Sequence, residues 1–344
     1  LFYIMKHKLL VSFFGILGII SCGKNDIKQE TSLYKLRQPD YFPEIAYSIE
    51  NNPVSREGFE LGKKLFNDPR LSLDNSVACS NCHVKAVAFT DPQHNPSVGI
   101  FNQSGKRNAP MIANMAFQKE FLWDGGISHL DFVPVFAIEH EKEMGEELNH
   151  VVSKLNNISE YSPLFKKAFP ALDTITSPYM LQALSQYMLL LVSDNAKYDR
   201  VQRGEDAFSS QELKGQQVFE QKCATCHSGA LFTNGKYMNN GLDSVFTDVG
   251  RELISAQASD LGKFKVPSLR NITLTSPYMH DGRFETINEV LEHYRNGVKT
   301  SSTLASELSN SEKLGIPLTD AEIDDLIIYL KTLTDYEFIS NPIF

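Results

Sequence analysis

Two pentapeptides with the same spacing constrain this chain more than any other feature. CSNCH spans residues 79–83 and CATCH spans residues 223–227, and in each of them a histidine directly follows a C-x-x-C pair. Such a cluster could hold zinc, form a redox disulfide or carry a haem. A zinc site does not require the adjacent histidine, and a thioredoxin-like pair belongs in a βαβ pattern that this sequence lacks. The two copies therefore predict two covalently bound haem c groups.

Each haem is expected to be held by two cysteines and one axial nitrogen. The histidine that ends each motif would supply that nitrogen to the iron, His83 for the first haem and His227 for the second. The predicted attachment sites are Cys79, Cys82, Cys223 and Cys226.

The amino terminus has the pattern of an export signal. Lys6 and Lys8 precede an apolar run over residues 9–21, which is too short for a membrane span. The run ends in IISC, which resembles the bacterial lipobox, in which the cysteine becomes the lipidated first residue. We therefore expect a lipoprotein signal peptide over residues 1–21, lipid on Cys22 and an exported, periplasmic protein anchored to the membrane by that lipid alone. The alternative is an ordinary secretion signal in which Cys22 has no role.

The composition of the chain excludes a nucleic-acid-binding protein. Its formal net charge is −9, which gives no general affinity for a polyanion. With 42% hydrophobic residues over 344 positions, the chain can form two globular domains. We expect a polar tether over residues 22–45, followed by domains over residues 46–204 and 205–344.

A similar helical segment precedes each haem motif. ELGKKLFNDP (60–69) and ELKGQQVFEQK (212–222) both carry Gly-x-x-aliphatic-Phe on one face, which is expected to pack on a haem edge. A buried helix is predicted over residues 177–201, and a helix with a capping box over residues 318–333. The fold class is therefore predicted to be mostly α.

Several further segments make the sequence resemble the bacterial di-haem cytochrome c peroxidase family, which includes the protein-oxidising enzyme MauG. The resemblance implies two c-type cytochrome domains, one covalent haem each, packed across an interface that contains Ca²⁺. The segments that carry it are LGKKLFNDPRLS (61–72), GKRNAP (105–110), FLWDGG (121–126), EMG (143–145), KVPSLRNITLTSPYMHDGRF (265–284) and HYRNG (293–297).

The resemblance also implies an activity. In this family the amino-terminal haem reacts with hydrogen peroxide, and the carboxy-terminal haem receives electrons from a small cytochrome c or a cupredoxin. Trp123 matches the aromatic residue between the haems, and Glu143 matches the acid that moves a proton at the peroxide site. Asn108 matches the side-chain ligand of calcium, with main-chain oxygens of Thr275 and Pro277 as partners.

Three positions depart from the pattern of the family. A frequent glutamine falls on Val133, and the histidine that blocks the peroxide haem in many relatives falls near Ile100, with His94 six residues away. The usual methionine ligand of the second haem falls on Tyr294, as in MauG, and Met279 is the alternative ligand.

The sequence therefore predicts a di-haem cytochrome c peroxidase that reduces hydrogen peroxide to water. A MauG-like enzyme that oxidises a protein or organic substrate is the first alternative, and a non-catalytic di-haem electron-transfer protein is the second. The electron donor is left unidentified, and a homodimer is left open.

Overall fold

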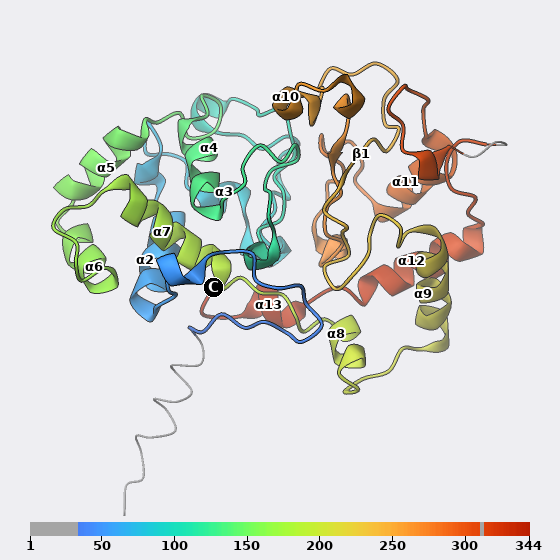
Figure 1. Cartoon of the computed structure of the whole chain (residues 1–344), viewed down its shortest axis with the longest axis horizontal. Helices are drawn as coiled ribbons and strands as arrows, with labels where there is room; N and C mark the ends of the chain where they lie inside the picture. The colour runs from blue at the N-terminus through green and yellow to red at the C-terminus, as the bar shows by residue number, and fades with distance from the viewer. Residues whose placement is uncertain (1–33, 310–312) are drawn as a thin grey trace, which may run out of the picture.

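The computed structural model of the protein describes residues 34–309 and 313–344. The predicted signal peptide, Cys22 and the first part of the tether lie outside these residues. The described chain is mostly helical and forms two lobes that lie side by side in Figure 1. Within the described ranges, no helix has the length and apolar character needed to cross a membrane.

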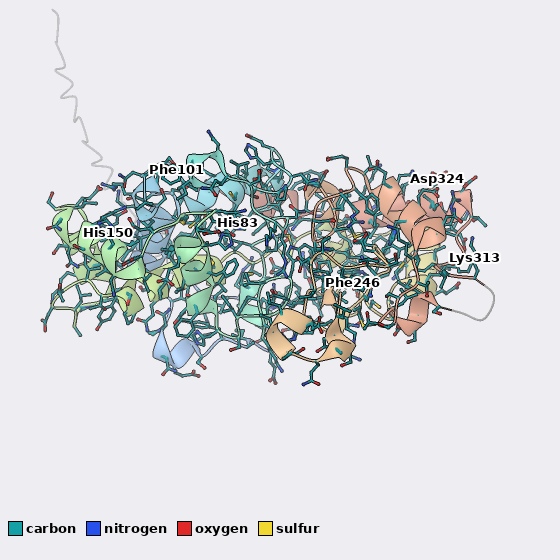
Figure 2. The ribbon with its side chains drawn as sticks, turned by 90° about the horizontal axis from the view of Figure 1, so that it is seen from above. His83, Phe101, His150, Phe246, Lys313 and Asp324 are labelled. Carbon is teal, nitrogen blue, oxygen red and sulfur yellow. The ribbon has the colours of Figure 1, made fainter. Side chains whose placement is uncertain are left out.

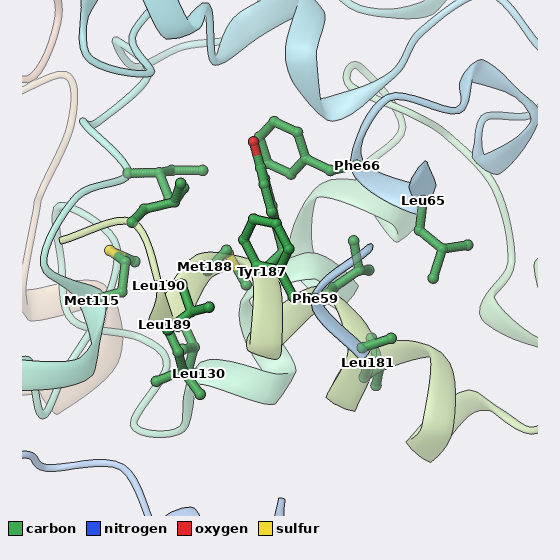
Figure 3. Close-up of a cluster of buried hydrophobic side chains, with 14 of the residues drawn as sticks. Phe59, Leu65, Phe66, Met115, Leu130, Leu181, Tyr187, Met188, Leu189 and Leu190 are labelled. Atoms are coloured by element: carbon green, nitrogen blue, oxygen red, sulfur yellow. The ribbon is translucent and has the colours of Figure 1, made fainter. Parts of the chain in front are cut away.

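The amino-terminal lobe consists of helices α2 to α7 around one apolar core. Helix α2 begins where the Ser55 side chain accepts a hydrogen bond from the Gly58 amide. Figure 3 shows part of the core, in which Phe59, Phe66 and Tyr187 lie close together. The helices are α2 Arg56–Phe66, α3 Cys79–Cys82, α4 Val133–Glu139, α5 Leu148–Asn157, α6 Tyr161–Ala168 and α7 Ser177–Leu189.

The carboxy-terminal lobe has fewer long helices and one short sheet. Strands β1 (Tyr237–Met238) and β2 (Phe264–Lys265) pair antiparallel, with Tyr237 opposite Lys265. The helices are α8 Lys197–Gln202, α9 Ser210–Lys222, α10 Glu252–Ser255, α11 Ile287–Glu292 and α12 Asp320–Lys331. The predicted capping box is confirmed at the start of α12, where Thr319 and Glu322 each accept a hydrogen bond from the main-chain amide of the other.

Each lobe contains a similar pair of packed helices. In the amino-terminal lobe α2 packs against α7, and in the carboxy-terminal lobe α9 packs against α12. A Cβ atom on Gly62 of α2 would lie 2.0 Å from the main-chain oxygen of Ala183 in α7. On Gly215 of α9 it would lie 2.1 Å from the main-chain oxygen of Asp325 in α12. Only glycine lets the backbones approach so closely. The glycine of each repeated segment therefore packs on a partner helix. Packing of the aliphatic and phenylalanine side chains of these segments on a haem edge stays a prediction.

The helix expected over residues 177–201 is interrupted. Helix α7 ends at Leu189 and α8 begins at Lys197. Between them Ser193 and Asn195 donate hydrogen bonds to the buried carboxylate of Asp335, at 3.0 and 2.9 Å. Hydrogen bonds from a short polar side chain or a main-chain amide to a distant carboxylate compete with the main-chain hydrogen bonds of a helix. This competition explains why the helix ends before Ser193.

The last helix, α13 (Tyr336–Ser340), returns from the carboxy-terminal lobe to the amino-terminal one. Phe338 is buried in the same apolar cluster as the core of α2 and α7, and Ile339, Ile343 and Phe344 pack against that cluster. In Figure 1 the end of the chain accordingly lies beside α2.

Candidate active site

A cavity of about 1200 Å³ lies between the lobes and brings together residues distant in sequence. From the amino-terminal lobe it is lined by Cys79, Cys82 and His83, and from the carboxy-terminal lobe by the loop that contains Met279. Figure 2 shows His83 toward the middle of the long axis of the molecule, between His150 near one end and Asp324 near the other. The first haem motif therefore faces the junction of the two lobes.

His83 is oriented by a main-chain oxygen. Its Nδ1 lies 2.9 Å from the carbonyl oxygen of Phe89 and donates to it. Burial lowers the pKa of His83, so the ring stays neutral with the lone pair on Nε2. A neutral imidazole whose other nitrogen is hydrogen-bonded is the form that binds a metal. His83 therefore fits the role of an axial ligand to haem iron.

His227 is held in the same way in the other lobe. Its Nδ1 lies 3.1 Å from the carbonyl oxygen of Phe232, and burial again lowers its pKa. Phe232 has a φ of +53° and Phe89 a φ of +61°, both in the left-handed region. The two motifs thus repeat one local geometry, which supports the same chemistry at each.

The cysteines of both motifs form no disulfide within the part of the chain that the structure describes. Burial raises the pKa of Cys79 to about 12 and that of Cys82 to about 11. Across the described ranges, no three histidine, cysteine, aspartate or glutamate side chains gather as metal ligands would. The site thus offers the thiols that thioether bonds to a haem require.

Glu143 lies in the wall of the same cavity. Its side chain is 40% exposed. Burial raises the pKa of Glu143 to about 7. The imidazole of His140 lies beside it, with Nδ1 3.9 Å from a carboxylate oxygen of Glu143. A carboxyl group that titrates near neutral pH can both accept and release a proton there.

The positions that depart from the family pattern occupy different places. Ile100 is 2% exposed and packs against Gly145, and its amide donates to the main-chain oxygen of Glu143 at 2.8 Å. His94 is held outside the cavity wall, where its Nδ1 lies 3.3 Å from the carboxylate of Asp91. Val133 lines the cavity. In this conformation, therefore, neither Ile100 nor His94 faces the first motif across the cavity.

Trp123 connects the two lobes at the cavity wall. Its indole N–H donates to the main-chain oxygen of Asn108 at 2.8 Å. Its own main-chain oxygen accepts a 2.7 Å hydrogen bond from the amide of Lys265 in β2. The indole is thus fixed by its N–H and the backbone of Trp123 by β2, and the role of Trp123 as an electron relay stays a prediction.

Asn108 is buried, and its contacts fit the expected calcium site. Its Nδ2 donates to the carbonyl oxygen of Pro277 at 2.5 Å, whereas its buried Oδ1 has no hydrogen-bond partner. Turning the amide over would bring Oδ1 toward the oxygen of Pro277, an arrangement that a cation between the two oxygens would stabilise. Thr275 lines the same cavity. The donors are an amide and carbonyls, the oxygen ligands that Ca²⁺ accepts.

Both candidate ligands of the second haem lie near Asn240. Its Nδ2 donates to the sulfur of Met279 at 3.4 Å, and its side chain also bonds the Tyr294 phenol. Burial raises the pKa of Tyr294 to about 12, and the nearby Cys226 and Cys223 thiols act in the same direction. Tyr294 belongs to a π-helical turn over His293–Gly297, a geometry frequent at functional sites. Tyr294 therefore lies close to the second motif.

An ion-pair network across the lobes was not predicted from the sequence. The Arg107 guanidinium donates to Asp124 at 2.5 Å and to both carboxylate oxygens of Asp248, at 2.6 and 2.8 Å. These contacts hold the pKa of Asp248 below its ordinary value, against the effect of burial. Arg107 and Asp124 belong to the segments GKRNAP and FLWDGG, which already stood out in the sequence. Their pairing with Asp248 was missed because Asp248 lies 141 residues from Arg107 in the sequence.

Comparison with known proteins decides the family. The model of the di-haem cytochrome c peroxidase family matches residues 56–207, and that of cytochrome c matches residues 213–334. Over 304 residues the chain is 33% identical to the methylamine utilization protein MauG of Methylophilus methylotrophus, covering 87% of this chain and 88% of that protein. The chain belongs to the di-haem cytochrome c peroxidase family. As a member of this family it is an oxidoreductase with two cytochrome c-type domains.

Other members of the di-haem cytochrome c peroxidase family are similar over most of the chain. The cytochrome c551 peroxidase of Pseudomonas aeruginosa is 30% identical over 302 residues, covering 85% of this chain and 83% of that protein. The crystal structure of a MauG-like protein associated with microbial copper homeostasis superposes with a TM-score of 0.83 at 28% identity, covering 90% and 98% of the two chains. The relatives thus include both peroxidases and MauG proteins.

Proposed function

We propose that this protein is a di-haem peroxidase that reduces hydrogen peroxide to water with electrons from a small cytochrome c or a cupredoxin. The observation that carries the proposal is that Glu143 and the first haem motif line the same cavity. Burial there raises the pKa of Glu143 to about 7. Haem iron with one open coordination position supplies the redox chemistry toward peroxide. Glu143 would take a proton from one peroxide oxygen and return it to the other.

The residues of the two motifs would hold the haems. Cys79 and Cys82 would bind the first haem and Cys223 and Cys226 the second, with His83 and His227 as axial ligands. Asn108, Thr275 and Pro277 would hold one Ca²⁺ at the junction of the lobes. Support comes from the two oriented imidazoles and from the unpaired Oδ1 of Asn108.

A second candidate function is favoured by Tyr294. A phenolate is a hard anionic ligand that stabilises oxidised iron, whereas a methionine raises the reduction potential. Tyr294 close to Cys223 and Cys226 would therefore suit a MauG-like enzyme that removes electrons from a protein or organic substrate.

We further propose that the protein is exported to the periplasm and anchored by lipid on Cys22. The IISC sequence after the apolar run supports this proposal. Two acyl chains would anchor stably where one chain gives only marginal membrane binding.

The proposal is tested by measuring peroxide consumption with a reduced small cytochrome c as the electron donor. We expect two molecules of the one-electron donor to be oxidised for each peroxide consumed. If peroxide instead oxidises added protein or phenol while the reduced cytochrome remains unchanged, the MauG-like alternative is correct.

A further inference from the structure

The carbonyl group that orients His83 belongs to a strained stretch of backbone. Ala88 and Phe89 have φ values of +56° and +61°, and their exposed fractions are 0% and 1%. A side chain with a Cβ atom adopts this region at a cost of about 1–3 kcal/mol. The surroundings must therefore hold Phe89 in place, and with it the oxygen that accepts the Nδ1 proton of His83.

Part of those surroundings comes from the far end of the chain. The ring of Phe338 in α13 lies 5.6 Å from the ring of Phe89, centroid to centroid, and Phe338 is 2% exposed. Phe344 packs in turn on Phe338 at 5.6 Å, edge to face. The segment over residues 335–344, which we call the strap, therefore backs Phe89 directly.

Two lysines of the amino-terminal lobe hold the strap by its main-chain oxygens. Lys63 Nζ donates to the carbonyl oxygen of Ile343 at 2.6 Å. Lys85, four residues before Phe89, donates to the carbonyl oxygens of Asn341 and Phe344. These contacts satisfy donors of the Lys85 ammonium group. The strap is thus fixed to the same turn that carries Phe89.

At its other end the strap is fixed where the two lobes meet. The buried Asp335 caps α13 by accepting from the Phe338 amide at 2.9 Å, and it accepts from Ser193 Oγ at 3.0 Å. The Asp335 amide donates to Oδ1 of Asn271 at 2.8 Å, and Asn271 belongs to the carboxy-terminal lobe. A displacement of that lobe would therefore be transmitted to α13.

Among the residues that the structure describes, no aromatic ring of helices α2 to α7 packs on Phe232 of the second motif. Phe232, which orients His227, packs against Tyr198 at 4.8 Å and Phe219 at 5.7 Å. Both rings belong to helices of the carboxy-terminal lobe. The proximal geometry is thus similar at the two motifs, but its support is different.

We propose that the strap is a positioning element for His83. By pressing Phe338 on Phe89 it holds the carbonyl oxygen against Nδ1, and it links the carboxy-terminal lobe to the axial ligand of the first haem. A firm hydrogen bond at Nδ1 makes Nε2 a stronger donor and lowers the reduction potential of the iron. The inference rests on the proposed ligation by His83, and peroxide turnover is not needed to test it.

The test measures the reduction potentials and electron paramagnetic resonance spectra of both haems in the holoprotein. We compare Phe338→Ala and the milder Phe338→Leu with Tyr336→Ala, which alters a side chain of α13 that is 69% exposed. If the strap positions His83, the first haem should have a higher reduction potential and an altered electron paramagnetic resonance signal in Phe338→Ala. The change should be smaller in Phe338→Leu. Tyr336→Ala should match the wild type, and the second haem should be unchanged in all three variants.

Two results would overturn the inference. One is a Phe338→Ala protein that folds with both haems attached and an unaltered first haem. The other is an equal shift of both haems, which would indicate a general loss of packing. If Phe338→Ala does not fold, Phe338→Leu and Lys85→Met decide by the same criterion. Failure of the peroxidase proposal would leave these potentials unaffected, so the two failures are distinguishable.

Discussion

Trp123 and Asn108 are joined by a 2.8 Å hydrogen bond from the indole N–H to the main-chain oxygen. One residue is the proposed electron relay between the haems and the other is the proposed side-chain ligand of calcium. Through this bond, the position of the indole depends on the loop that would bind the cation. The relay and the calcium site are therefore expected to fail together when either is disturbed.

Replacing Trp123 with phenylalanine should separate the two half-reactions. The ring keeps most of its volume but loses both the N–H donor and the easily oxidised indole. We expect steady-state turnover with a reduced cytochrome to fall about tenfold or more, equivalent to about 1.4 kcal/mol in the barrier. The first reaction of the protein with peroxide should keep its wild-type rate. A loss confined to that first reaction would show that Trp123 acts at the peroxide site instead.

Replacing Glu143 with glutamine should slow peroxide cleavage by about 10²–10⁴-fold, the range for loss of a general acid–base group. Both haems should remain attached, because Glu143 is not one of the residues that would bind a haem covalently. Glu147→Gln is the matched control, since Glu147 is an exposed glutamate on the same loop. Rapid mixing with peroxide gives the rate of cleavage. A wild-type rate in Glu143→Gln would show that Glu143 takes no part in the mechanism.

The pH dependence follows from the same carboxyl group. Burial raises the pKa of Glu143 to about 7, so the group becomes able to accept a proton as the pH rises through 7. The groups around it are His140, whose pKa burial lowers, and the charged side chains of Glu141 and Lys142. We expect the peroxide rate to rise from pH 6 to pH 8 in the wild type and to be flat in Glu143→Gln. The same rise in the variant would assign the titration to His140.

Features with local causes were predictable from the sequence. The two C-x-x-C-H motifs carry their chemistry within five positions, and the Thr319–Glu322 capping box needs only one helical turn. The contact of Phe338 with Phe89 was not predictable, because it joins two residues far apart in the sequence and depends on a left-handed Phe89. For the same reason the break after α7 was missed, since Ser193 bonds to Asp335, 142 residues away.

The sixth ligand of the second haem should be Tyr294. In Tyr294→Phe we expect loss of the phenolate ligand and a higher reduction potential for that haem alone. Met279→Ala should leave the spectrum of the second haem unchanged. A methionine-to-iron charge-transfer band that survives Tyr294→Phe and disappears in Met279→Ala would instead assign the ligand to Met279.

Calcium should stabilise the junction of the lobes through Asn108. At a free concentration 100 times its dissociation constant, a single bound ion adds about 2.7 kcal/mol to the free energy of unfolding. We therefore expect a chelator to lower the melting temperature of the wild type and to have little effect on Asn108→Ala. Asn102→Ala, at an exposed position of the preceding loop, should respond like the wild type. Equal chelator effects in all three proteins would place the ion elsewhere.

The most direct test of the account is stopped-flow mixing of the fully oxidised protein with hydrogen peroxide. Because Ile100 is buried against Gly145 and His94 is held by Asp91, the first haem should have an open or weakly water-bound position. We predict an immediate spectral change at the first haem without any prior reduction. A low-spin spectrum with two histidine ligands, unreactive until the protein is reduced, would contradict the account. Loss of that spectrum in His94→Ala would identify His94 as the blocking ligand.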